Sequence, residues 1–197
     1  VLVNGGAAET ADPAVVATLA ATDNRGVTGY CLTADATAPD LEDFQPVAAV
    51  SPYNADVPHI LPGGDGMAWV YAWFRDAAGN VSVPVSAAIV LDTASPTITA
   101  FRLEAGRIWA PNRLLAVRLE ATDARGVTGY ALAEDTNPPA PAAFTAVAAT
   151  PALAADVAFT LTTPDDGLKT AYAWVRDAAG NVSKEASDAV TLDTQAP

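Results

Sequence analysis

Short segments in which apolar and polar residues alternate run along the chain. In one of them Leu115, Val117 and Leu119 are separated by Ala116, Arg118 and Glu120, and residues 15–21 repeat the same order. A period of two is typical of a strand with one buried face. Similar short runs occupy residues 127–133, 157–161, 170–175 and 187–192. Turn residues separate these runs and no helical period is sustained, so the pattern predicts an all-β chain with about seven short antiparallel strands per hundred residues, which is typical of a sandwich.

The chain also repeats itself at an offset of 100 or 101 residues. Residues 21–30 match residues 121–130 at nine of ten positions, and residues 70–82 match residues 171–183 at eleven of thirteen. A period near 100 residues is long enough for a self-contained domain, whereas solenoid repeats have periods of about 20–50 residues. The sequence therefore predicts two tandem β-sandwich domains.

The phase of the repeat places the domain boundaries. We expect the first domain at residues 1–93 and the second at residues 94–197. Val1 aligns with Phe101, so the first copy is expected to have a truncated first strand that lacks a counterpart of residues 95–100. The last residues, DTQAP, match DTASP at the first junction, which predicts that similar units adjoin this pair.

Composition and charge narrow the function classes. Hydrophobic residues make up 51% of the chain and charged residues 17%, which favours packed cores over disorder. The 23 acidic and 10 basic residues give a net charge of −13, which repels phosphate backbones and anionic lipids. No apolar run reaches the roughly 18 residues of a membrane helix. We therefore expect neither a nucleic-acid partner nor membrane insertion.

Few residues offer catalytic chemistry. Cys31 is the only cysteine and its counterpart is Ala131, which predicts a small core residue rather than a disulfide or thiolate site. His59 is the only histidine and occupies the place of Phe159, so a core or edge position is its simplest interpretation. Because no nucleophile, metal or phosphate motif accompanies them, the chain is not expected to be an enzyme and requires no cofactor.

One motif carries a family resemblance. Residues 174–183 read WVRDAAGNVS and are followed about ten residues later by LDTQAP, and the first copy has the same arrangement. This arrangement resembles the bacterial immunoglobulin-like, or fibronectin III-like, tandem repeats of secreted and cell-surface proteins. The resemblance implies two tandem sandwiches of that type and an extracellular or cell-surface location, with anchoring regions elsewhere.

The segment DAAGN is expected to form a hairpin loop, and a Greek-key connection would bring it near the TDNRG or TDARG loop. Oxygen ligands of the kind that Ca²⁺ prefers then gather around the junction of the two domains. The candidate interdomain calcium ligands are Asp92, Asp123, Asp177 and Asn181. The weaker half-site in the first copy would comprise Asp23, Asp76 and Asn80.

Turn formation is the alternative interpretation of the same residues. Asp and Asn side chains commonly bond backbone amides within their own loop, and no contiguous calcium-binding loop is present. The sequence leaves both interpretations open.

A stripe of aromatic residues is the second candidate site. Its members are Trp69, Tyr71 and Trp73 in the first copy, echoed by Tyr172 and Trp174 in the second. If exposed, they could bind sugar rings; the alternative is that they pack inside the sandwich. The intervening residues are also apolar, so the pattern does not decide which face is buried.

The leading functional hypothesis is a structural or adhesive repeat, a stalk or spacer, that acts as a monomer. Its partners would be neighbouring repeats of the same chain and a surface protein or polysaccharide. A carbohydrate-binding module that uses the aromatic stripe is the alternative.

Overall fold

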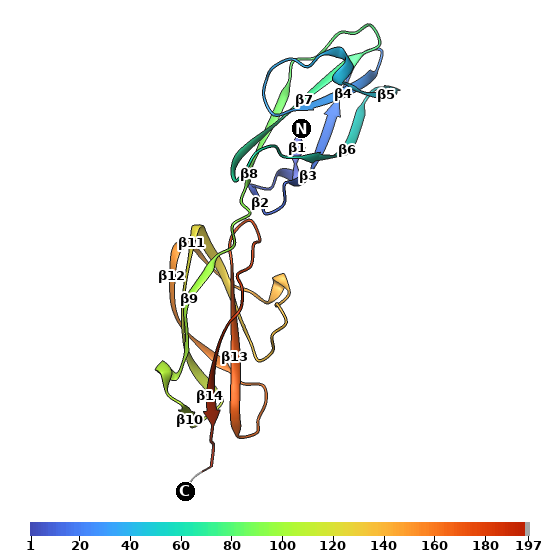
Figure 1. Cartoon of the computed structure of the whole chain (residues 1–197). Helices are drawn as coiled ribbons and strands as arrows, with labels where there is room; N and C mark the ends of the chain where they lie inside the picture. Colours follow the sequence, from blue (N-terminus) through green and yellow to red (C-terminus); the bar gives the residue numbers. More distant parts are fainter. Residues whose placement is uncertain (196–197) are drawn as a thin grey trace. The chain divides into compact units, whose positions relative to one another are not determined.

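The computed structural model describes residues 1–195. The chain divides into two compact units, Val1–Thr93 and Ala94–Pro197 (Figure 1). Within residues 1–195 the regular structure of both units consists of strands and short 3-10 turns, joined by loops. No helix within residues 1–195 is long and apolar enough to cross a bilayer.

The first unit contains two sheets. Its strands are β1 (Leu2–Val3), β2 (Glu9–Thr10), β3 (Ala14–Ala21), β4 (Val27–Thr33), β5 (Gln45–Val50), β6 (Tyr53–Ile60), β7 (Gly66–Asp76) and β8 (Val85–Leu91). One sheet has the order β1-β3-β6 and the other has the order β2-β8-β7-β4-β5. Two 3-10 turns, η1 (Asn4–Gly6) and η2 (Leu41–Asp43), lie in the connections.

The second unit follows the same plan with fewer breaks between strands. Its strands are β9 (Thr97–Leu103), β10 (Trp109–Ala110), β11 (Leu114–Ala133), β12 (Thr145–Thr160), β13 (Gly167–Arg176) and β14 (Ala186–Leu192), with the turns η3 (Glu104–Gly106) and η4 (Pro141–Ala143). The first part of β11 pairs with β9 and with the end of β12, whereas its last part pairs with β13. The long strand β11 therefore corresponds to β3 and β4 together.

The alternating segments build the cores. In β3 the side chains of Val15, Ala17 and Leu19 are buried while those between them are exposed. The first half of β11 buries Leu115, Val117 and Leu119 in the same way. In the first unit the side chains of both sheets meet in the core. In the second unit side chains from β9 and β11 meet those from β13 and β14. The predicted all-β fold with an alternating, half-buried strand pattern is confirmed.

The two units differ at their first strand. β9 runs for seven residues along β11, whereas β1 contributes only Leu2 and Val3 to the matching edge of β3. The sheet of β3 consequently has a much shorter edge strand than its counterpart in the second unit.

A substitution in the core of one unit is expected to destabilise that unit alone. Leu19→Ala should lower the free energy of unfolding of the first unit by about 3 kcal/mol, because a buried leucine truncated to alanine loses apolar burial and leaves a cavity. Leu119→Ala should do the same to the second unit. Differential scanning calorimetry of both variants checks this, and a single variant that weakened both units equally would contradict it.

Candidate functional site

The two DAAGN segments form loops organised by their aspartate. In the first unit, Asp76 Oδ1 accepts hydrogen bonds from the backbone amides of Ala78 and Asn80, both at 2.9 Å. The side-chain amide of Asn80 donates to Asp76 Oδ2 at 2.6 Å, and this bond is the main cause of the lowered pKa of the Asp76 carboxyl. Gly79 has a φ of 87°, a conformation that favours glycine. The Asp, Gly and Asn of DAAGN are therefore spaced as this turn requires.

The second unit holds its DAAGN loop by similar bonds. Asp177 Oδ1 accepts from the amides of Gly180 at 2.7 Å and Asn181 at 2.9 Å, and its Oδ2 accepts from the Asn181 side chain at 2.8 Å. The turn interpretation of Asp177 and Asn181 thus has direct geometric support.

The aspartates of the other loop also bind backbone amides. Asp23 Oδ1 accepts from the amides of Arg25 and Gly26, both at 2.8 Å. Asp123 Oδ1 accepts from the matching amides at 2.8 and 2.7 Å. At Gly26 the φ is 105°, and an added Cβ would lie 2.9 Å from the backbone nitrogen of Val50, so the loop requires glycine there.

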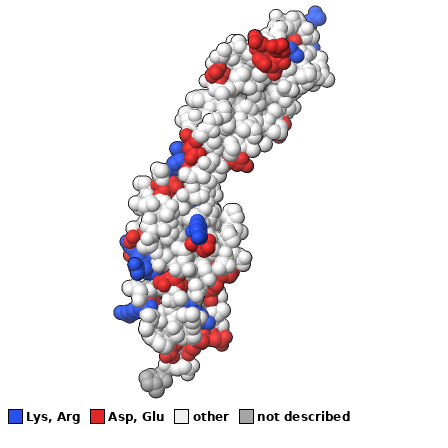
Figure 2. Space-filling model, viewed as in Figure 1, with Lys and Arg blue, Asp and Glu red and all other residues white. Residues whose placement is uncertain are grey.

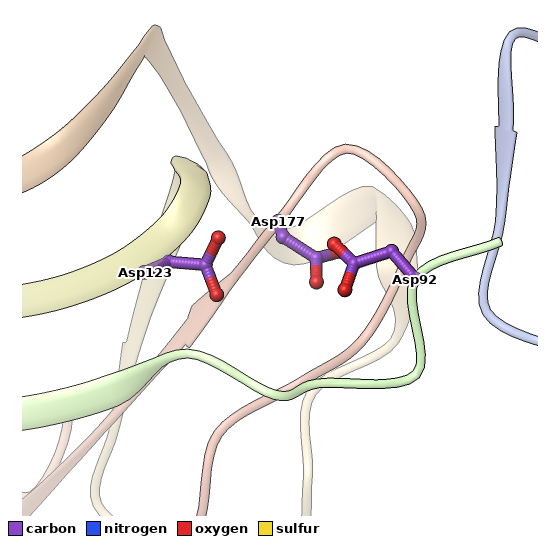
Figure 3. A group of neighbouring side chains, drawn as sticks. All are labelled: Asp92, Asp123 and Asp177. Carbon is purple, nitrogen blue, oxygen red and sulfur yellow. The ribbon is translucent and has the colours of Figure 1, made fainter. Parts of the chain in front are cut away.

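The two kinds of loop lie together within a unit, as the Greek-key expectation required. In the first unit Asp23, Asp76 and Asn80 line one cavity of about 200 Å³. In the second unit the carboxylate oxygens of Asp123 and Asp177 approach within 4.8 Å of one another, and Figure 3 shows these two side chains. Figure 3 also draws Asp92, which follows β8 in the first unit, where its backbone amide donates to the carbonyl oxygen of Thr10 at 3.0 Å.

Oxygen ligands of this kind suit Ca²⁺ chemically. Calcium binding by the four residues named from the sequence stays a prediction, as does the half-site of the first unit.

The arginine of the repeated motif has a structural role that the sequence analysis missed. The Arg75 guanidinium carbon lies 5.3 Å from the ring centre of Phe44, and Arg75 Nη1 donates to the carbonyl oxygen of Leu41 at 2.6 Å. In the second unit Arg176 lies 4.9 Å from the ring centre of Phe144 and donates to the carbonyl of Pro141 at 2.8 Å. Each arginine therefore holds in place the connection that carries η2 or η4, which we call the crossing loop.

Glycine makes room for this arginine. A Cβ at Gly29 would lie 2.7 Å from Arg75 Nε, and one at Gly129 would lie 3.1 Å from Arg176 Nε. The signal in the sequence was that Phe44 and Arg75 both recur in the second copy, as Phe144 and Arg176.

The aromatic stripe does not form a continuous platform. Trp73 is 6% exposed and Trp174 is 2% exposed, so neither indole offers a face to a sugar ring. Trp73 packs with Cys31 and Phe44, and its indole nitrogen donates to Thr33 Oγ1 at 3.0 Å. Trp174 packs with Ala131 and Phe144 in the same way. These two tryptophans lie under the crossing loops, on the outer face of the sheet rather than between the sheets.

The remaining members of the stripe are more accessible. Trp69 is 44% exposed, and its ring centre lies 6.2 Å from that of the partly buried Tyr71. Tyr172 is partly buried beside Trp174 at 6.3 Å. The intervening side chains Val70 and Ala72 point into the core, which explains why both faces of this strand are apolar.

His59 and Cys31 take half-buried and buried positions in the first unit. His59 lies on β6 opposite Val15, and its Nε2 is shielded from solvent with no hydrogen-bond partner among residues 1–195. Burial lowers the pKa of His59 and raises the pKa of the Cys31 thiol. A thiol with a raised pKa is less reactive, which fits the interpretation of Cys31 as a packing residue.

Neither the known protein families nor the curated proteins contain a match to this chain. Some solved structures, however, are similar to this chain. The FN1–FN3 domains of chicken CNTN1 are 13% identical with a TM-score of 0.51, and the match covers 97% of this chain and 66% of that one. The fibronectin(III)-like modules of Clostridium thermocellum CbhA are 12% identical with a TM-score of 0.47, covering 97% and 92%. The D00-D0 domain of intimin is 13% identical with a TM-score of 0.31, covering 95% of each chain.

The strand pairings of the two units and the CNTN1 match agree on the architecture. Both units are fibronectin III-like, immunoglobulin-like sandwiches. The fold expected from the WVRDAAGNVS motif is thereby confirmed. At 13% identity the likeness concerns the fold alone.

The shielded His59 should make the stability of the first unit depend on pH. Because its pKa is lowered in the folded state, the unfolded chain binds the proton first, near its ordinary pKa of about 6.5. The stability of the first unit should therefore fall as the pH drops from about 7.5 to about 5.5, a range in which unfolded carboxylates stay ionised. Thermal unfolding at the two pH values measures the loss.

His59→Phe, which introduces the residue of the second unit, should remove this loss. If the variant unfolded with the same pH dependence as the natural chain, another group would be responsible.

The calcium prediction is tested by isothermal titration of the whole chain. The expected result is binding heat with Ca²⁺ that Asp123→Asn largely removes, because the amide keeps the loop hydrogen bonds of Oδ1 but loses the charge that the ion needs. Asp23→Asn in the first unit is the matched control and should change little. If the unmutated chain gave no binding heat, the prediction of calcium binding would be rejected and only the turn interpretation would remain.

Proposed function

We propose that this chain is a pair of non-catalytic structural repeats that serve as a spacer or adhesive stalk in an extracellular or cell-surface protein, of the bacterial kind that the motif resembles. One observation carries the proposal. The polar residues that recur in both copies, the loop aspartates and the motif arginines, are engaged in holding the fold of their own unit. The repetition thus preserves an architecture rather than a set of reacting groups.

In each unit the last strand pairs with a short strand near the start of the unit, in an arrangement that resists tension. β2 and β8 run parallel, and the amides of Val90 and Asp92 donate to the carbonyls of Ala8 and Thr10, both at 3.0 Å. β10 and β14 are joined likewise, by the amides of Thr191 at 2.8 Å and Asp193 at 3.0 Å. Because the two strands are parallel, a pull on opposite ends of a unit shears these bonds together instead of opening them one at a time. Such a pairing suits a load-bearing module.

The surface fits an exposed spacer. On the face drawn in Figure 2 much of each unit is uncharged, and the acidic and basic side chains stand in small groups. The net charge of −13 favours solubility as a monomer and disfavours nucleic acid as a partner. We infer that neighbouring repeats of the same chain are the main partners, with a surface protein or polysaccharide as the target of an adhesive stalk.

Carbohydrate binding has less support. With Trp73 and Trp174 buried, the sugar-binding face would be reduced to Trp69 and Tyr71 in the first unit. The residue that matches Trp69 in the second unit is Thr170, so the platform is not repeated.

Force spectroscopy on single molecules tests the mechanical proposal. Pulling the chain should give two separate unfolding events, each releasing a contour length of about 30 nm, the span of one unit at roughly 3.5 Å per residue. Asp193→Pro removes the amide that donates to Ala110 and should lower the unfolding force of one event only. Asp193→Ala keeps the amide and is the control. Unchanged forces in the proline variant would show that the parallel strands do not bear the load.

A further inference from the structure

An aspartate that directly precedes β7 in the first unit is bonded to a threonine that follows the end of β8. Asp65 Oδ1 accepts hydrogen bonds from the backbone amide of Thr93 at 3.0 Å and from its hydroxyl Oγ1 at 2.8 Å. Both residues are exposed, and 28 residues separate them in the sequence. Asp65 therefore ties the segment that leaves β8 to the start of the neighbouring strand.

The second unit has the same pair of hydrogen bonds. Asp166 Oδ1 accepts from the amide of Thr194 at 3.0 Å and from its hydroxyl at 2.9 Å, again across 28 residues. The loops that carry the two aspartates differ in length and sequence, LPGGDG at residues 61–66 and LTTPDDG at residues 161–167. The contact is present in both units although the loop around it has changed, which indicates that the pair has a role of its own.

The bonded threonine follows a backbone contact between the parallel strands. The amide of Asp193 donates to the carbonyl oxygen of Ala110 at 3.0 Å, which joins the end of β14 to β10. Thr194 comes next and is held on the other side, because Asp166 directly precedes β13. The end of β14 is therefore fixed to the strands on both of its sides.

We propose that Asp65 and Asp166 act as end clamps, which keep the last residues of β8 and β14 from fraying when the chain is under tension. A strand that frays at its end loses its hydrogen bonds one at a time, whereas a strand held at its end must break them together. This inference rests on the load-bearing role proposed above and adds the residues that protect the loaded strand. Because water competes for exposed hydrogen bonds, each clamp should add little to thermal stability.

Amide hydrogen exchange followed by NMR tests the clamp in the second unit. In Asp166→Ala the amides of Thr191 and Asp193 keep their own acceptors. They should nevertheless exchange about tenfold faster, because loss of a hydrogen bond to a charged group lets the strand end fray more often. Asp165→Ala is the matched control, since it removes the neighbouring exposed carboxylate, which makes no hydrogen bond within residues 1–195. If only Thr194 exchanged faster, or if both variants had equal effects, the clamp would be refuted.

Force spectroscopy separates this inference from the proposed function. Asp166→Ala should lower the force of one unfolding event and leave the other unchanged, while Asp165→Ala changes neither. The melting temperature of Asp166→Ala should stay within about 4 °C of that of the natural chain, as for most surface substitutions. A larger fall would show that Asp166 supports the whole unit rather than the end of β14, and would overturn the proposal.

Asp193→Pro tests the parallel strands independently of the clamp. If Asp193→Pro lowered the unfolding force and Asp166→Ala did not, the clamp would be refuted and the load-bearing role would stand. If neither variant lowered the force, both proposals would fail.

Discussion

The burial of alternate side chains in β3 and in the first half of β11 is the constraint on which each sandwich depends. Val15, Ala17 and Leu19 face the core from the middle of their sheet, and Leu115, Val117 and Leu119 do so in the second unit. A shift by one residue would turn all of these side chains outward, so the register of the neighbouring strands is fixed with them. The loops at the pole are positioned by the strands that this register holds.

Those loops explain why acidic residues recur at matching positions of the two units. An aspartate that accepts two or three hydrogen bonds from its own loop is held by a charge-assisted network, and its position varies little. The lowered pKa of Asp76 reflects this arrangement, because its hydrogen bonds favour the ionised form. The same hydrogen bonds hold these carboxylates in place at one pole of each unit.

Much of the fold could be predicted from the sequence because its causes are local. The period of two in residues 115–121 identifies a strand, and the Asp, Gly and Asn of DAAGN identify a turn. The burial of Trp73 and Trp174 could not be predicted in this way, since it depends on the crossing loops of residues 41–44 and 141–144, which lie far away in the sequence. Periodicity tells which residues share a face, but it does not tell what covers that face.

The same distinction applies to the arginines. Nothing near Arg75 in the sequence indicates that it reaches the carbonyl of Leu41 or the ring of Phe44. A long side chain that spans two distant segments is specified by the tertiary fold, and only the parallel occurrence of Arg176 with Phe144 hints at it. Internal repetition therefore supplies information that a single copy lacks. When two distant positions carry the same pair of residues in both copies, those two residues are candidates for a contact.

Comparison of the two units also shows where the packing of the first differs. His59 replaces Phe159 at the edge of the core, and Cys31 replaces Ala131 beneath the crossing loop. An imidazole nitrogen shielded without a hydrogen-bond partner has an energetic cost that a phenyl ring does not have. His59 lies on β6 opposite Val15 of β3, so this pair of strands, rather than the β4 and β7 pair, should govern how the stability of the first unit responds to pH.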